Sequence, residues 1–240
     1  MLAHRVMMGV AKGKAPNELS TTVFRWYKAS QITGLSDGDP VSQWDDESAN
    51  ADHAVQATSA NQPTYKVGII NGKPVVRFDG SNDWLALSEL FDSSSAVAHM
   101  FVVAAPSTSG ARAMLSTRQS DGQSGWSLRH NPQTTLQYFH AGGGATPVVS
   151  YTVAAQANII EVQRNGLNAQ LGANGALGSV TAISTYVASS ANRTLIGAEN
   201  DGTASFFAGD IAETATYSSL LSSADRLALI QHFKAEYGIS

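Results

Sequence analysis

Short apolar runs recur along this chain, and clusters of turn-forming residues separate them. In the run 158–165, apolar and polar residues alternate with the two-residue period of a strand that has one wetter side. Turn signals such as Asn71-Gly72 and Asp79-Gly80 supply the positive φ angle that tight turns require. The clearest runs are 22–27, 74–78, 99–105, 111–117, 125–130, 135–140, 158–165, 193–198 and 206–219. Short strands at this spacing predict an all-β fold, either an antiparallel sandwich or a barrel.

One helix is predicted near the end of the sequence. Ser222 is a candidate N-cap with Asp225 three residues later, as in a capping box. Gly238 is a candidate C-cap. Between the caps an apolar stripe recurs at helical spacing, and we expect it to pack on the sheets. The members of that stripe are Leu227, Ile230, Phe233 and Tyr237.

Composition narrows the class of protein. The 240 residues are 43% hydrophobic and only 14% charged, and no linker or repeat divides them, so we expect one domain over residues 19–240 with a sizeable core. The net charge of −4 argues against binding of nucleic acid or of an anionic membrane. The absence of cysteine excludes a disulfide scaffold and thiolate metal sites. No apolar stretch reaches the roughly 18 residues that a spanning helix needs.

Residues 1–18 form a separate N-terminal arm in this prediction. Their apolar piece, "VMMGVA", is shorter than the roughly 7 to 15 residues of a signal-peptide core, so we expect the arm to stay in the mature protein. The arm is locally cationic. It is either a solvated tail or a segment that docks on a partner subunit. The candidate docking residues are His4, Arg5, Lys12 and Lys14.

Four segments resemble the laminin-G-like, concanavalin A-like jelly-roll family of bacterial and bacteriophage surface proteins. They are 26–56, 62–85 with "NGKPVVRFDG", 193–202, and 206–239 with "GDIAETATY". Two departures from the family pattern lie in the first segment, where Lys28 replaces an Asp and "ESANADH" replaces a glycine-rich turn. The resemblance implies a two-sheet antiparallel jelly-roll sandwich with a short C-terminal helix. It implies no single function, because this fold hosts binding, structural and catalytic proteins.

One candidate ligand site follows the run 74–78. Asp79, Asn82 and Asp83 surround Gly80 in "FDGSND". Asp and Asn before Gly hydrogen bond their own backbone, so the first interpretation is a turn. The alternative is a calcium site on the rim of the sandwich, since carboxylate and carbonyl oxygens are the ligands that calcium prefers.

Two tryptophans lie beside acidic loops. Trp44 begins "WDDE" near Asp52 and His53, and Trp84 follows the turn just described. We interpret the loops 36–39 and 44–53 as solvated, with metal or sugar-hydroxyl recognition as the alternative. The tryptophans either pack in the core or stack on a sugar ring or a protein partner. The candidate ligand-binding residues are therefore Trp44, Asp79, Asn82, Asp83 and Trp84.

The motifs of catalysis are absent from the sequence. Glycosidases need two carboxylates about 5 to 10 Å apart, whereas Glu161 and Glu213 each stand alone on a predicted strand. The six histidines show no metal-binding spacing. We therefore predict a non-catalytic structural or binding module, first a bacteriophage capsid or tail decoration protein on the virion surface with other virion proteins as partners. The alternative is a secreted or cell-surface lectin-like adhesion module for glycans, with calcium as a possible cofactor, and a glycoside hydrolase comes last.

Overall fold

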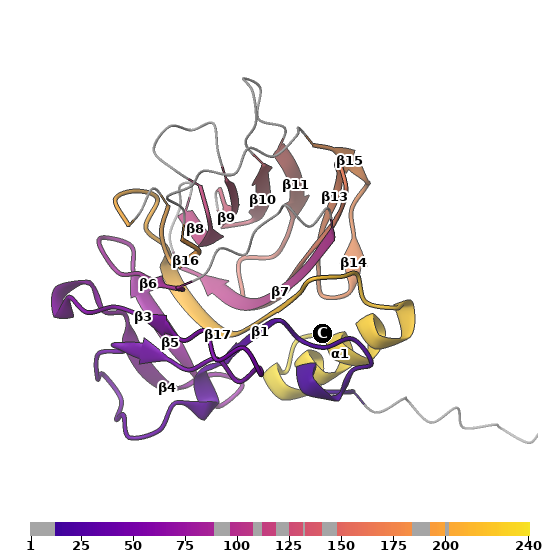
Figure 1. Cartoon of the computed structure of the whole chain (residues 1–240). Helices are drawn as coiled ribbons and strands as arrows, with labels where there is room; N and C mark the ends of the chain where they lie inside the picture. The colour runs from indigo at the N-terminus through magenta and orange to yellow at the C-terminus, as the bar shows by residue number, and fades with distance from the viewer. Residues whose placement is uncertain are drawn as a thin grey trace, which may run out of the picture.

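Two antiparallel sheets pack face to face in the computed structural model, which describes residues 13–88, 97–107, 112–118, 125–131, 133–140, 148–183, 193–199 and 202–240 (Figure 1). One α-helix, α1 (Ser223–Tyr237), follows the last strand. Three short 3₁₀ turns lie earlier in the chain, at η1 (Pro16–Glu18), η2 (Ala29–Gln31) and η3 (Ser59–Asn61). This arrangement confirms the predicted all-β sandwich with a C-terminal helix.

Sheet A has nine strands, in the order β14-β13-β12-β7-β17-β5-β4, with β1 also beside β17 and β15 beside β13. The central strands β7 and β17 pair along most of their length, and Ala212 forms a bulge in β17. The strands are β1 (Arg25–Lys28), β4 (Thr64–Ile70), β5 (Lys73–Asp79), β7 (Val97–Pro106), β12 (Asn158–Asn165), β13 (Asn168–Ala173), β14 (Ala176–Leu177), β15 (Thr181–Ala182) and β17 (Ala208–Tyr217).

Sheet B has eight strands, in the order β11-β10-β9-β8-β16-β6-β3-β2. Each of the predicted apolar runs overlaps a strand of one sheet or the other. The strands of sheet B are β2 (Gln43–Trp44), β3 (Ala54–Val55), β6 (Leu85–Ala86), β8 (Arg112–Ser116), β9 (Trp126–His130), β10 (Thr135–His140), β11 (Val148–Thr152) and β16 (Leu195–Ile196).

The main core lies between the two sheets. Inward-facing residues alternate along the strands, as the period of two requires. Val102 and Val162 of sheet A and Leu128 of sheet B are fully buried there. Burial of apolar area at about 25 cal/mol per Å² makes this interface the principal stabilising element of the fold.

A second core lies on the outer face of sheet A, beneath α1. Phe101 and Val103 of β7 pack there against Phe233. Ser222 caps α1 by accepting the backbone N–H of Asp225 at 3.1 Å, and Gly238 ends the helix with φ at 63°. Both predicted caps are therefore confirmed.

The predicted apolar stripe of α1 is wrong at one position. Leu227 is 52% exposed, and Leu229 is buried in its place beside Ile230, Phe233 and Tyr237. At 3.6 residues per turn, a residue six positions before Phe233 lies about 120° away from it around the helix. The residue four positions before Phe233 lies on the same face.

The described part of the arm, from Gly13 onward, lies against α1 (Figure 1). The backbone N–H of Lys14 donates to the carbonyl of Ala228 at 3.0 Å, and the Tyr217 hydroxyl donates to the carbonyl of Pro16 at 3.5 Å. The Lys14 ammonium lies 4.0 Å from the Asp225 carboxylate. His4, Arg5 and Lys12 lie outside the described residues. Within the described ranges, no helix combines the length and apolar character that crossing a membrane requires.

Candidate functional site

The carboxylates of the segment 79–83 are used within their own turn. One oxygen of Asp79 accepts the backbone N–H groups of Ser81 at 2.7 Å and Asn82 at 3.2 Å. Asp83 in turn accepts the N–H of Asp79 at 2.9 Å. The Asn82 amide donates to the carbonyl of Ala60 at 2.6 Å. These contacts are those of an Asx-type turn, the first of the two interpretations that the sequence allowed.

Asp83 is buried in this turn although its neighbour Asp79 is exposed. Burial raises the pKa of Asp83 to about 6, and the charge of Asp79 adds to the rise despite the hydrogen bond from the backbone. The ionised form of Asp83 is therefore disfavoured in the folded protein.

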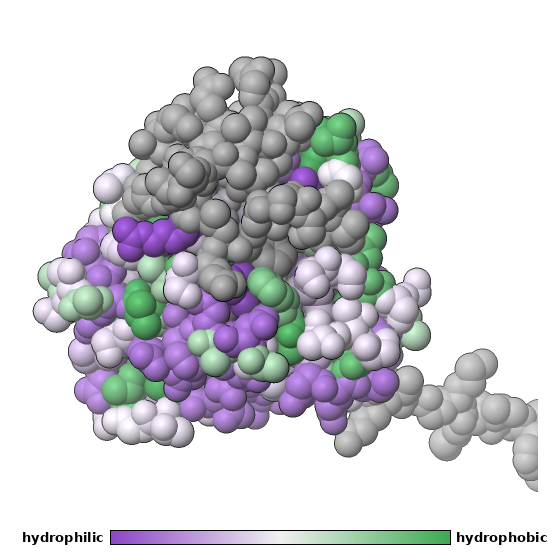
Figure 2. Space-filling view, in the orientation of Figure 1, coloured by the Kyte–Doolittle hydropathy of each residue, from purple (hydrophilic) through white to green (hydrophobic). Residues whose placement is uncertain are grey.

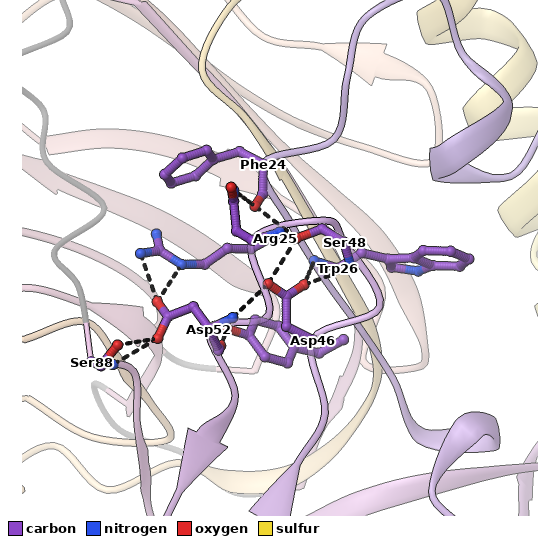
Figure 3. Close-up of polar contacts among 9 residues, drawn as sticks. Phe24, Arg25, Trp26, Asp46, Ser48, Asp52 and Ser88 are labelled. Atoms are coloured by element: carbon purple, nitrogen blue, oxygen red, sulfur yellow. Dashed lines mark hydrogen bonds and ion pairs between the residues drawn. The ribbon is translucent and has the colours of Figure 1, made fainter.

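Two acidic residues of the loop after Trp44, Asp46 and Asp52, are buried, which corrects the expectation of a solvated loop at these two positions (Figure 3). Asp45 and Glu47 of the same loop are exposed, as expected. Arg25 is buried between the sheets, and its Nε and one terminal nitrogen each lie 2.8 Å from an oxygen of Asp52. Ser88 donates to the other Asp52 oxygen from its hydroxyl at 2.6 Å and its backbone N–H at 2.9 Å. Burial acts to raise the pKa of Asp52, but the bonds from Ser88 and the charge of Arg25 outweigh it and lower the pKa.

Asp46 closes the same loop. Its carboxylate accepts the backbone N–H groups of Trp26 at 2.9 Å, Ser48 at 2.9 Å and Asp52 at 3.1 Å. In the described part of the chain, His, Asp and Glu residues form no group of three or more that could hold a metal ion. Through Asp46 and Asp52, the loop connects β1 by hydrogen bonds to Ser88, which follows β6 of sheet B.

Trp44 and Trp84 have different surroundings. Trp44 is fully buried in the main core, edge to face with Tyr27 at 6.0 Å between ring centroids, so no face of its indole is open for stacking. Trp84 is half-buried on the outer face of sheet B. We therefore keep only Trp84 among the candidate stacking residues.

Glu161 lies beneath α1 with an exposed fraction of 1%, so the outer side of β12 is covered and not wet as its alternation suggested. Its carboxylate accepts Arg226 at 2.6 and 2.7 Å and the Gln163 amide at 2.8 Å. His99 Nε2 lies at 2.7 Å, and because His99 Nδ1 accepts the Leu221 N–H, Nε2 carries the proton and donates. Burial opposes ionisation, but the bonds from His99 and Arg226 outweigh it and lower the pKa of Glu161 to about 2.

Glu213 is the second carboxylate beneath the helix. It accepts the indole N–H of Trp26 and the hydroxyl of Tyr237, both at 2.6 Å, and the Lys28 ammonium lies 3.8 Å away. Burial raises the pKa of Glu213, because the Lys28 charge and these bonds only partly offset the lost hydration. Glu161 and Glu213 thus both fix the helix to sheet A.

A cationic cluster lies on the outer face of sheet B, and sequence reasoning did not identify it. The Arg129 guanidinium stacks 3.4 Å above the centroid of the Phe139 ring, and that of Arg118 lies 5.4 Å from the same centroid. Both guanidinium groups face the buried carboxylate of Glu199, at 3.6 and 3.7 Å. Among the described residues, two positive charges therefore face one negative charge.

Several polar atoms of this cluster lack hydrogen bonds. Arg118 Nε, Arg129 Nε and Glu199 Oε1 are buried, and none has a hydrogen-bond partner among the described residues. Burial also lowers the pKa of Arg129, although Glu199 acts in the opposite direction. Buried polar groups normally have partners, so an arrangement of this kind is suited to an anionic or polar ligand.

An apolar patch adjoins the cluster. Trp84 and Phe206 pack there around Leu195 and Ala198, and Ala198 directly precedes Glu199. Gly202, at φ +80°, lies against the indole, where a Cβ would come within 2.5 Å of the ring. The Trp84 N–H has no hydrogen-bond partner in the described ranges. We call the combined region the outer-face surface and define it by Trp84, Arg118, Arg129, Phe139, Glu199 and Phe206.

The register of sheet B explains how the surface forms. Arg129 directly follows the core residue Leu128 in β9, so it lies on the opposite side of the sheet. It pairs with Ala113 on β8 and with Gln137 on β10. Phe139, two residues after Gln137, lies on that same side. An Arg in "GWSLRH" and a Phe in "TLQYFH", each out of phase with its core residues, was the available sequence signal.

The sequence matches no protein-family model, and a search of curated proteins finds no match. Solved structures do share the fold. The botulinum neurotoxin type G receptor-binding domain has a TM-score of 0.56 at 12% identity, over 90% of this chain and 52% of that domain. Trypanosoma rangeli sialidase in complex with sialic acid has a TM-score of 0.56 at 10% identity, over 88% of this chain and 33% of the enzyme. A weaker similarity, with a TM-score of 0.47 at 13% identity, is to the Ruminococcus gnavus IT-sialidase CBM40 bound to α2,3-sialyllactose, over 57% of this chain and 85% of that one.

At these identities the similarity defines the fold alone. The chain has a concanavalin A-like jelly-roll fold, as its sequence segments suggested, and it spans about half of the toxin domain and a third of the sialidase. None of these structures is described as a virion protein, so the virion location and virion partners stay predictions.

Proposed function

We propose that this chain is a non-catalytic module that binds acidic glycans through the outer-face surface. The observation that carries this proposal is the pair Arg118 and Arg129 over Phe139. Among the described residues these two arginines face one carboxylate, and the Nε atom of each has no hydrogen-bond partner. A sialylated oligosaccharide is the ligand class that fits best. Part of a sialidase in complex with sialic acid shares this fold, and that similarity supports the choice of ligand class.

The chemistry of the surface suits both parts of such a ligand. A guanidinium group presents its N–H donors in a planar fork that matches the two oxygens of a carboxylate. The apolar faces of Trp84 and Phe206 can cover the C–H face of a sugar ring while its hydroxyl groups stay hydrated. Affinity then depends on the acidic group, and the aromatic residues orient the ring.

Binding without hydrolysis agrees with where the described carboxylates lie. Asp46, Asp52, Glu161 and Glu213 are buried and hydrogen bonded to their own framework. A glycosidase requires two carboxyl groups about 5 to 10 Å apart on either side of the substrate bond. Among the described residues of the outer-face surface the one carboxylate is Glu199, which faces two arginines and accepts the Ser205 hydroxyl at 2.9 Å.

Calorimetric titration with 3′-sialyllactose and with lactose tests the proposal. We expect sialyllactose to bind at least about ten times more tightly, a difference of roughly 1.4 kcal/mol that one charge-assisted contact can supply. Arg118→Ala and Arg129→Gln should remove that preference. Arg77→Ala is the matched control, because it deletes a half-exposed arginine, paired with Asp210, on the other sheet.

Equal affinity for the two sugars would refute the proposal. An equal loss of affinity in Arg77→Ala and Arg118→Ala would also refute it, because the effect would then follow net charge and not this surface.

A further inference from the structure

A pocket of about 220 Å³ lies on the outer side of sheet A, away from the outer-face surface. It lies at the hairpin where β12 ends and β13 begins, beside β15 and the residues that precede α1. Figure 2 shows hydrophobic residues gathered along this edge of the molecule, over β13, β14 and β15, beside hydrophilic ones. Its lining residues are Gln163, Asn165, Asn168, Ala169, Gln170, Val180 and Leu220.

Four of those side chains are carboxamides, and the strand register brings them together. Gln163 of β12 pairs with Gln170 of β13, and Asn165 pairs with Asn168. Side chains of directly paired residues lie on the same face of a sheet, about 5 Å apart at their Cβ atoms. We call this site the amide pocket.

Two of the carboxamides have a fixed orientation. The Gln163 amide nitrogen donates to Glu161 at 2.8 Å, and an ionised carboxylate can only accept. The Gln170 amide nitrogen donates to the carbonyl of Gly178 at 3.1 Å. No described residue donates to the carbonyl oxygen of either side chain, so both oxygens are acceptors left for a ligand.

The other two carboxamides are available in full. Asn165 and Asn168 are exposed, and their side chains make no hydrogen bond to any residue that the structure describes. Each offers a carbonyl acceptor and two N–H donors. Val180 is 60% exposed beside them, and it forms an apolar wall with Leu220.

The chemistry of the lining selects the ligand. No lining residue is charged, and Glu161, the carboxylate that Gln163 contacts, is already paired with Arg226. A charged ligand would therefore lose hydration without compensation. Alternating donors and acceptors suit hydroxyl groups, which do both. The volume is below the roughly 300 Å³ at which pockets for drug-sized ligands begin, so it suits a single ring.

We propose that the amide pocket binds one neutral sugar ring, with Gln163 and Gln170 accepting from its hydroxyl groups and Val180 and Leu220 covering its C–H face. This is a second binding site, independent of the one proposed for acidic glycans.

Side-chain amide resonances in ¹H–¹⁵N NMR spectra test this inference. The probes are the methyl glycosides of glucose, galactose, mannose and N-acetylglucosamine, each titrated separately into the full chain. At least one of them should shift the resonances of Asn165 and Asn168 in a saturable manner. The double variant Asn165→Ala/Asn168→Ala should weaken that binding at least about tenfold, and Gln43→Ala should not, because Gln43 is an exposed carboxamide on sheet B.

Two results would overturn the inference: no saturable shift with any of the four glycosides, or unchanged affinity in the double variant. Thermal unfolding of the double variant checks that it is folded. Retained binding of 3′-sialyllactose by that variant distinguishes failure here from failure of the outer-face surface, since the two sites lie on different sheets.

Discussion

Single residues in this protein show why a sequence motif and a site are different things. Asp79, Asn82 and Asp83 were candidates because three oxygen-bearing side chains surround one glycine, and the structure places their polar atoms in the turn itself. Trp44 was a candidate because acidic residues follow it, and it lies in the core. Arg129 and Phe139 were not among the predicted site residues, although each occupies an outward position of its strand. Short-range spacing identified turns well, but only the pairing of distant strands reveals which side chains meet.

Asp83 supports a prediction at this scale. Its pKa in the folded protein is raised to about 6, so the stability it contributes is present below its ordinary pKa near 4 and is lost as the pH rises through 6. Asp83→Asn keeps an oxygen that can accept the Asp79 N–H but cannot ionise. We expect this variant to be more stable than the wild type at pH 8, by roughly 1 to 2 kcal/mol, and equal to it at pH 3.5.

Urea unfolding at the two pH values measures this difference. Asp39→Asn is the control, because Asp39 is only half-buried and its carboxylate also accepts a backbone N–H, that of Ser36. A variant at position 83 that is less stable than the wild type at pH 8 would show that the charge of Asp83 is needed in the turn.

For the strands and the helix, the sequence predicted the boundaries and caps more accurately than which side of each element is buried. The run 158–165 became β12 at its predicted boundaries, and Ser222 and Gly238 bound α1. The outer side of β12 was expected to be wet, yet α1 covers it. No local pattern says that a helix more than 50 residues later will bring Arg226 to Glu161. The polar residues beneath α1 form buried ion pairs and hydrogen bonds that hold the helix on sheet A. Their sequence pattern is the same as that of a solvated face.

The ion pair of Glu161 with Arg226 predicts a loss of stability at acid pH. Because the folded-state pKa of Glu161 is lowered to about 2, its contribution to stability is present above its ordinary pKa of about 4.5 and is lost as the pH falls from there to 2. Glu161→Gln should lower the free energy of unfolding at pH 7 by about 2 to 4 kcal/mol, since it leaves Arg226 without a charged partner. The variant should then lose less stability than the wild type between pH 4.5 and 2.

Chemical unfolding across that pH range tests both statements. Glu47→Gln serves for comparison, because it removes an exposed carboxylate whose pKa is raised by its surroundings and not lowered. If Glu161→Gln and Glu47→Gln behaved alike, Glu161 would not hold the helix in place.

At the scale of the whole molecule, the sandwich presents two chemically different outer faces. Sheet A carries α1 and the neutral amide pocket, and sheet B carries the cationic and aromatic outer-face surface. The all-β class and the final helix could be predicted, because alternation, turn residues and helix caps are local signals. The choice of a two-sheet sandwich over a barrel came from the family resemblance. The strand order and the outer-face surface could not be predicted, since Trp84, Arg129 and Glu199 come together only through the pairing of strands far apart in the chain.

In the proposed function, the outer-face surface holds the acidic part of a glycan. The direct measurement is an NMR titration of the isotope-labelled chain with 3′-sialyllactose, followed at the backbone amides and the arginine Nε–H groups. We expect saturable shifts confined to β8, β9, β10 and the segments around Trp84, Glu199 and Phe206, with the Nε–H signals of Arg118 and Arg129 among the most affected. Absence of any saturable shift, or shifts centred on α1 and β4 with those two signals unmoved, would contradict it.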